Sequence, residues 1–120
     1  MTLEEVRALI ATLPETQERD EYSGTTWRVR KWILARLTRN GDSLEIAEVG
    51  YDERDLLVEL EPETYFVVPG AESFRIVWAN IATVNPGTLL RLLQPRWRRS
   101  ATKRAIRAYD ALSFSKNGDQ

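Results

Sequence analysis

Hydrophobic and polar residues alternate most regularly between Thr26 and Glu48, on either side of Asn40-Gly41. Asn-Gly is typical of a two-residue hairpin loop with a type I′ turn, in which both central residues need a positive φ. One face of this hairpin would be apolar, and the other would carry opposite charges across from each other. Counting outward from the turn predicts the cross-strand pairs Arg39–Asp42, Leu37–Leu44, Arg36–Glu45 and Ala35–Ile46.

A further strand is expected at 25–29, and its link to the strand at 33–38 follows from the faces of the two strands. A two-residue loop at Arg30-Lys31 would set Arg28 opposite Ile33 and mix the faces. A longer loop that includes Trp32 keeps the buried residues on one side, so it is the prediction. The expected inner face is Trp27, Val29, Ile33, Ala35, Leu37, Leu44 and Ile46, and the expected outer face is Thr26, Arg28, Leu34, Arg36, Glu45 and Ala47.

Apolar residues spaced by three and four predict a helix at the start of the chain and a short one in the middle. Thr2 and Glu5 form a capping box for the first helix, which Pro14 ends. The middle helix is expected from a cap at Asp52 to Leu60, with an apolar side of Leu56, Leu57 and Leu60.

Two helices are expected in the last third of the chain. The first begins at an Asn85-Pro86 cap and is kinked or split at Pro95. The second covers about 101–112. Their apolar positions are Leu89, Leu90, Leu93 and Trp97 in the first helix, and Ala105, Ile106, Tyr109 and Leu112 in the second.

An edge strand at 16–22 and a second hairpin, at 64–68 and 74–79, complete the expected elements. Both faces of the second hairpin are largely apolar, which leaves its inward side open. The expected fold class is α/β (α+β): a two-layer sandwich with an antiparallel sheet of about five or six strands, an N-terminal helix, a short middle helix and C-terminal helices. A single domain is expected over residues 1–112, with a flexible tail at 113–120.

Composition excludes several kinds of chemistry. The chain has neither cysteine nor histidine, which removes disulfides, thiolate catalysis, the usual zinc ligands and the commonest general base. No P-loop or GxGxxG pattern occurs among the six glycines. We therefore expect a protein that is not an enzyme, with no cofactor and no metal site.

The apolar segments are too short to suggest a membrane protein. No apolar run approaches the ~20 residues that cross a bilayer. The first residues are acidic and amphipathic, unlike a secretory signal. A cytoplasmic location is therefore expected, and no membrane partner.

Charge is divided unevenly along the chain, although the net charge is −1. Residues 1–63 contain 15 acidic and 8 basic residues, a balance of −7, and residues 64–120 contain 3 acidic and 9 basic, a balance of +6. Between Thr88 and Tyr109 there are seven basic residues and no acidic one. This asymmetry indicates either an acidic and a basic face, or halves that neutralise each other on folding.

Several stretches of the chain together resemble the MmcQ/YjbR family. They are WRVRKWILARL, DSLEIA, the YFVVPG and FRIV hairpin, and RWRRSATKRA, in the family's order over about Leu13 to Arg104. The resemblance implies a CyaY-like or secretion-chaperone-like sandwich, in which helices pack against an antiparallel sheet. It also implies a bacterial DNA-binding protein with a double-wing motif.

The motif positions match the family unevenly. Residues 27–29 fall on its F-R-V, residues 33–35 on its I-F-A, Phe74 on a usual tryptophan, and Lys103-Arg104 on the K-R of a closing P-K-R-L. Gly24-Thr25 replace the family's His-Pro. Residues 30–32 replace its Gly-Gly-Lys turn, and Thr102 replaces the proline of the closing pattern.

The first candidate site is the predicted hairpin tip, Arg30, Lys31 and Trp32. Two cations and an aromatic ring suit phosphate contact together with stacking on a base. Alternatively, the cations are solvated and Trp32 packs on a neighbouring element. One of these bulky residues is expected to occupy a left-handed backbone conformation, at a cost of about 1 kcal/mol.

The second candidate site is the run of cations near the C-terminus. On a continuous helix, Arg96, Arg99, Lys103 and Arg107 share one stripe, with Arg104 at its edge. Neighbouring like charges repel by roughly 0.2–0.5 kcal/mol per pair, so the stripe favours an anionic partner. Phosphates would supply it, and so would the acidic residues of the first half.

Other charged residues are weaker candidates. Arg36 is expected to pair with Glu45 across the hairpin, whereas Arg28 faces Leu34 and has no assigned partner, so it joins the candidate nucleic-acid-binding residues. A carboxylate cluster of Glu18, Asp20 and Glu21 could hold a cation, but solvated charge on an edge strand is the favoured interpretation. Trp27, Trp78 and Trp97 are expected in the core.

Three functions are open at this point. The leading hypothesis is weak, salt-dependent DNA binding through the hairpin tip and the basic helix. The second is a protein-interaction or chaperone-like module, in which the sheet face holds a protein partner or a second copy of the chain. The third is a small-molecule-binding or resistance protein, suggested by the family's occurrence beside antibiotic biosynthesis.

Overall fold

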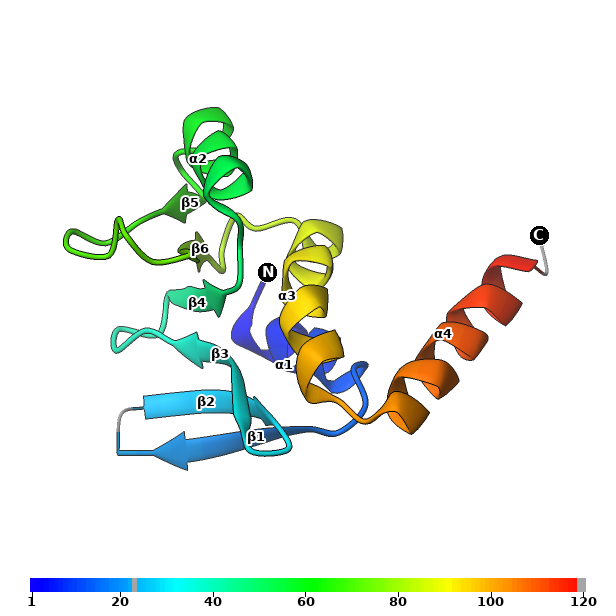
Figure 1. Ribbon diagram of the computed structural model, residues 1–120. Helices are drawn as coiled ribbons and strands as arrows, with labels where there is room; N and C mark the ends of the chain where they lie inside the picture. Colours follow the sequence, from blue (N-terminus) through cyan, green and yellow to red (C-terminus); the bar gives the residue numbers. More distant parts are fainter. Residues whose placement is uncertain (23, 119–120) are drawn as a thin grey trace.

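The computed structural model describes the backbone of residues 1–22 and 24–118 and the side chains of 1–22 and 24–112. A six-stranded antiparallel sheet forms one layer, in the spatial order β1-β2-β3-β4-β6-β5. Helices α1 and α3 cover one face of this sheet, α2 lies beyond β5, and α4 points away from the body (Figure 1). The α+β two-layer sandwich predicted from the sequence is therefore confirmed.

The elements follow one another along the chain as two strand-rich segments, β1 to β4 and β5 to β6, separated and flanked by helices. They are α1 (Leu3–Ala11), β1 (Thr16–Glu21), β2 (Gly24–Val29), β3 (Trp32–Leu37), β4 (Ser43–Ala47), α2 (Tyr51–Leu60), β5 (Tyr65–Phe66), β6 (Ile76–Asn80), α3 (Pro86–Ser100) and α4 (Lys103–Gly118).

The first helix begins as its capping box predicts. The Thr2 hydroxyl accepts a hydrogen bond from the Glu5 amide, and the Glu5 carboxylate accepts one from the Thr2 amide. Val6 and Ile10 are buried against the sheet layer. The Pro14 carbonyl accepts a hydrogen bond of 2.8 Å from the Trp97 indole, which joins the end of α1 to α3.

The hairpin of β3 and β4 has the predicted register but a different turn. Ala35 pairs with Ile46 and Leu37 with Leu44. The loop has four residues, 39–42, so the expected Arg39–Asp42 pair does not form. Among its residues only Gly41 has a positive φ, +78°, so the type I′ turn was wrong. Asn40 instead donates to the Asp42 carboxylate at 3.1 Å, and such local side-chain bonds favour a wider loop.

The link between β2 and β3 is the shorter loop that face matching rejected. Val29 pairs with Trp32 and Arg28 with Ile33, leaving Arg30-Lys31 as a two-residue loop. A β-bulge at Leu34 inserts one extra residue into β3, so Trp27 still pairs with Ala35. Leu34 is buried, Ile33 only half-buried. The bulge restores the apolar face that the three-residue loop had been expected to provide.

Helix α2 is oriented differently from the prediction. Its N-cap is Gly50, with no side-chain hydrogen bond, rather than Asp52. Arg54 is buried beneath the helix, where its guanidinium donates to the carbonyl oxygens of Glu72 and Phe74. Because the helix turns this side inward, Leu56 and Leu60 are exposed.

The second hairpin is shorter than predicted. Only Tyr65 and Phe66 form β5, which pairs with β6, and a long loop connects them. Tyr65 and Val77 point to the core. Trp78 is also buried, but on the outer row of the sheet, where Phe66 stacks on it at a centroid distance of 6.3 Å.

The C-terminal helices meet at a sharp break. Asn85 caps α3 as expected, accepting from the Thr88 amide at 3.1 Å, and α3 continues through Pro95 to Ser100 without splitting. Ala101 is extended, with ψ of 158°, and ends α3. Helix α4 then extends past Leu112, which is exposed rather than buried, while Ala105, Ile106 and Tyr109 are half-buried as predicted.

The predicted flexible tail, 113–120, lies outside the residues whose side chains the structure describes. Residues 113–118 belong to α4 as backbone.

Candidate functional site

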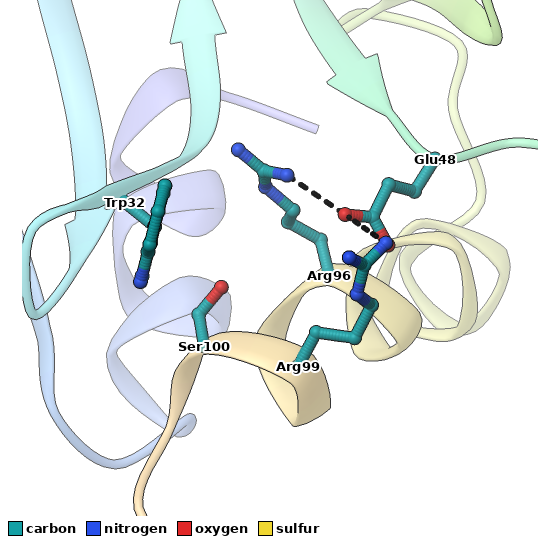
Figure 2. A pocket seen from close by; sticks show the side chains of 5 residues that line it. All are labelled: Trp32, Glu48, Arg96, Arg99 and Ser100. Carbon is teal, nitrogen blue, oxygen red and sulfur yellow. Dashed lines mark hydrogen bonds and ion pairs between the residues drawn. The ribbon is translucent and has the colours of Figure 1, made fainter.

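A hollow of about 130 Å³ brings the two sequence-predicted candidate sites together. It is lined by Trp32 at the start of β3, Glu48 after β4, and Arg96, Arg99 and Ser100 from the last turn of α3. Figure 2 shows the indole of Trp32 on one side and the two guanidinium groups on the other. The packing of α3 on β3 and β4 therefore creates the hollow from residues far apart in the chain.

Glu48 organises the cationic side of the hollow. Its Oε1 accepts a hydrogen bond of 2.7 Å from Arg96 and lies 3.1 Å from Nη1 of Arg99 (Figure 2). The Nε of Arg96 also donates to the Ile33 carbonyl at 2.9 Å. One carboxylate thus faces two guanidinium groups, which leaves an excess of positive charge.

Trp32 and Arg99 are the accessible parts of this site. The indole is 47% exposed, and the Arg99 side chain is 75% exposed. The ammonium of Lys31 lies 5.1 Å from the centroid of the indole ring, a cation–π distance. Ser100, a buried residue, also lines the hollow. This combination suits an anionic group beside a planar ring.

The hairpin tip lies next to the hollow, as a loop of two residues rather than three. Arg30 and Lys31 are both exposed. Arg30 has φ of +57°, the left-handed conformation that the sequence placed somewhere in this loop. Together with Trp32, Arg96 and Arg99, these residues make five of the nine predicted contact residues one continuous region.

Arg28 is not the unpaired cation that the sequence suggested. Its Nε and Nη2 donate to the two carboxylate oxygens of Glu21 at 2.6 and 3.0 Å. These hydrogen bonds raise the pKa of Arg28 and lower the pKa of Glu21. In the β1–β2 pair Arg28 lies opposite Gln17 and Glu21 opposite Gly24, so the two long side chains meet diagonally across the strands as a fork-to-fork ion pair.

The predicted stripe of cations is broken at Ala101. Arg96 and Arg99 stay at the hollow, while Lys103, Arg104 and Arg107 are exposed on α4, which leaves in another direction. Within the described side chains, no ion pair joins these three to a carboxylate. Acidic residues neutralise the α3 cations instead: Arg91 pairs with Glu53 and Arg98 with Asp110.

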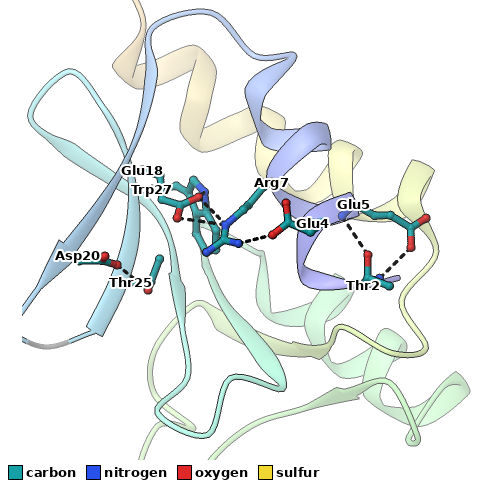
Figure 3. Close-up of polar contacts among 8 residues, drawn as sticks. All are labelled: Thr2, Glu4, Glu5, Arg7, Glu18, Asp20, Thr25 and Trp27. Atoms are coloured by element: carbon teal, nitrogen blue, oxygen red, sulfur yellow. Dashed lines mark hydrogen bonds and ion pairs between the residues drawn. The ribbon is translucent and has the colours of Figure 1, made fainter.

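The carboxylates of the edge strand are occupied by the protein itself (Figure 3). Glu18 accepts from Arg7 at 3.0 Å and from the Trp27 indole at 3.1 Å, and Asp20 accepts from the Thr25 hydroxyl. Among the described residues, no group of three or more acidic side chains could hold a metal ion. Arg36 pairs in register with Glu45, yet its Nε is buried without a hydrogen-bond partner.

Sequence reasoning missed Glu48 and Ser100. Glu48 has φ of +63°, and nothing in the local pattern marks a glutamate for this left-handed conformation. Ser100 joins the site only because α3 ends there. The excess of cations near the C-terminus did indicate that acidic residues of the first half could pair with them, and Glu48 is one of these residues.

Fold and hollow together define a small α+β domain with a cationic, aromatic-lined surface site. No protein-family model matches the chain, and neither curated proteins nor solved structures give a significant match to it. No helix in the described part of the chain is long and apolar enough to cross a membrane.

Proposed function

We propose that this protein binds nucleic acid, with DNA as the leading candidate, and that it does so without catalysing a reaction. The observation that carries the proposal is the half-exposed Trp32 facing Arg96 and Arg99 across one hollow. The resemblance to the MmcQ/YjbR family points to the same function. A phosphate would meet Arg99 and the tip cations, and a base would stack on the indole.

The charges around the hollow support an anionic ligand. Arg96 and Arg99 share one carboxylate, that of Glu48, and within the described side chains no ion pair joins the exposed Arg30 and Lys31 to a carboxylate. The three exposed cations at the start of α4 would extend the track for a longer strand. Because the whole chain carries −1, the expected affinity is modest and depends strongly on salt.

The size of the hollow argues against a whole organic molecule as the ligand. About 130 Å³ accommodates a phosphate or a small planar edge, whereas sites for drug-sized ligands usually enclose ~300–1,000 Å³. The middle of the outer sheet face carries Arg36 and Glu45, which suits an apolar protein partner poorly. These observations favour nucleic acid over the other two functions.

The test is a titration of labelled single-stranded and duplex DNA at several salt concentrations between 50 and 200 mM, followed by fluorescence anisotropy of the label. Changing Arg30 and Lys31 together to Glu should lower the affinity and reduce the salt slope by about 1 to 2 units, because each lost phosphate contact removes roughly 0.7–0.9. Trp32→Ala should lower affinity about 5- to 100-fold with little change in slope, since stacking releases no counter-ions.

Arg39→Glu is the matched control, because Arg39 is an exposed cation at the other hairpin turn. It should bind as the unaltered protein does, apart from a small uniform loss. If Arg39→Glu and the double variant lost DNA affinity equally, the loss would be explained by the change in overall charge and not by the hairpin tip. Unaltered binding in both the double variant and Trp32→Ala would remove the hollow from the proposal.

A further inference from the structure

Helix α2 exposes an apolar stripe bordered by acidic residues. Leu56 and Leu60, one turn apart, are 53% and 68% exposed. Asp52, Glu53 and Glu59 lie on either side of them along the helix, all exposed. Since the buried Arg54 holds the opposite side of α2 on the loop before β6, the leucines cannot turn inward. The stripe is therefore a stable feature of the surface.

Helix α4 presents surface of the opposite charge. It rests on α3 through Tyr109, whose ring lies 4.9 Å from that of Trp97, and through the Arg98–Asp110 ion pair. Its other side carries Lys103, Arg104 and Arg107, followed by Ala108, Ala111 and the 72% exposed Leu112. The helix projects from the body (Figure 1). It is thus cationic at its start and apolar further along, and much of it is uncovered.

The two helices cannot neutralise each other within one molecule. Helix α2 lies beyond β5 at one end of the sheet, and α4 points away from the far side of α3 (Figure 1). Among the residues that the structure describes, no ion pair joins α2 to α4. The ion pair that α2 does form with a C-terminal cation is Glu53 with Arg91, which belongs to α3. Each charged, partly apolar surface is left for another molecule.

We propose that α4 of one molecule docks on α2 of a second copy of this chain. Lys103 and Arg107 would face Asp52 and Glu59, while Leu56 and Leu60 would cover Ala111 and Leu112. The opposite charges at the borders fix how the two helices are aligned and oriented against each other. Burial of the leucine and alanine side chains stabilises the contact. If each molecule offers its α4 to the other, the pair is closed by a two-fold axis.

The association of the purified protein without nucleic acid tests this proposal. Sedimentation velocity over a concentration series should show a dimer whose population rises with concentration and falls with added salt. Replacing both Lys103 and Arg107 with Glu, or both Asp52 and Glu59 with Lys, should weaken the dimer by about tenfold or more. Circular dichroism and thermal unfolding of each variant check that it is folded.

A mixture of the two variants gives the decisive result. One variant has acidic residues on both helices and the other has basic residues on both, so each alone repels its own copies. Mixed in equal amounts, they should form a heterodimer, because each α4 then meets an α2 of opposite charge. Arg39→Glu, a charge reversal away from both helices, should dimerise like the unaltered protein.

Two outcomes would overturn the docking proposal. The first is an unaltered protein that stays monomeric at millimolar concentration and low salt. The second is a mixture in which the two folded variants do not associate. Because no nucleic acid is present, neither outcome bears on the proposed DNA contact, and loss of DNA binding in the tip variants leaves the docking test unaffected.

Discussion

At the scale of single residues, Glu48 has the greatest influence on the hollow. Its carboxylate is shared by Arg96 and Arg99, and it is the acidic residue among the five that line the site. A ligand phosphate would compete with this carboxylate for the same guanidinium groups. The residue therefore orders the site and at the same time weakens its attraction for anions.

Replacing Glu48 with Gln should raise the affinity for DNA several-fold and steepen its salt dependence, because one negative charge beside the bound phosphate is removed. The same change should lower the free energy of unfolding by about 1 kcal/mol, since charge-assisted bonds to two arginines are weakened. DNA titrations and urea unfolding measure the two effects. Glu45→Gln, on the outer face of β4, is the control. Weaker DNA binding by Glu48→Gln would mean that the carboxylate helps the ligand.

The residue scale also shows which contacts the sequence could predict. The Thr2–Glu5 capping box and the Asn85 cap depend on neighbours in the chain, and both formed as expected. The partner of Arg28 depends on the register of β1 with β2, which local pattern does not specify. The long-range partner of Arg28 was therefore missed and these two caps were predicted, although the Asp52 cap and the type I′ turn, which also depend on neighbours, were wrong.

At the scale of elements, the bulge in β3 decides which side chains reach the core. Strict alternation places Ile33 inside and Leu34 outside. The extra residue at the bulge reverses this, because two residues of β3 then oppose one position of β2. Sequence patterns of period two cannot register a single inserted residue unless glycine marks it. In the observed two-residue loop, only Arg30 takes a strained left-handed conformation. The bulge then returns the apolar residues of β2 and β3 to the same face, so the shorter loop does not mix the faces.

This assignment predicts a clear order of stabilities. Leu34→Ala should lower the free energy of unfolding by about 2–4 kcal/mol, because a fully buried leucine leaves a cavity. Ile33→Ala should cost less, roughly 1 kcal/mol, since this side chain is only partly buried. Equilibrium unfolding in urea compares the two variants. If Ile33→Ala proved the more damaging change, the bulge would be misplaced.

At the scale of the whole molecule, the acidic first half and the basic second half of the chain neutralise each other only in part. Acidic residues from the first half pair with Arg91, Arg96 and Arg99 of α3, as one alternative expected, while Lys103, Arg104 and Arg107 of α4 stay exposed. The fold class and most helix positions could be predicted because apolar periodicity reflects burial on one layer. The direction of α4 could not, because it depends on the break at Ala101 and on how Trp97 and Tyr109 pack.

Carboxylates on different elements make stability fall in acid. Hydrogen bonds from Arg98 lower the pKa of Asp110 below 3.8, those from Arg28 lower the pKa of Glu21, and those from Thr2 lower the pKa of Glu5 below 4.5. A carboxyl group whose pKa is lower in the folded than in the unfolded protein stabilises the fold at every pH above its unfolded-state pKa. That stabilisation is lost as pH falls through the folded pKa.

Thermal unfolding midpoints should therefore be flat near neutral pH and decline once pH falls below about 4.5. Asp110→Asn should reduce the decline below 3.8, because an amide cannot take up the proton. Arg98→Ala should have the same effect, since it removes the cause of the lowered pKa. An unchanged acid limb in both variants would show that α3 and α4 are not coupled through this ion pair.

The uneven exposure of the four tryptophans has an optical consequence. Trp27, Trp78 and Trp97 are buried, whereas Trp32 is half in water beside two arginines. The tryptophan fluorescence of the native protein therefore comes from three shielded indoles and one at the surface. Iodide, a negatively charged quencher, is attracted to the surface indole by the neighbouring arginines. The protein carries an intrinsic emission probe at its own candidate site, and occupancy can be followed without attaching a dye.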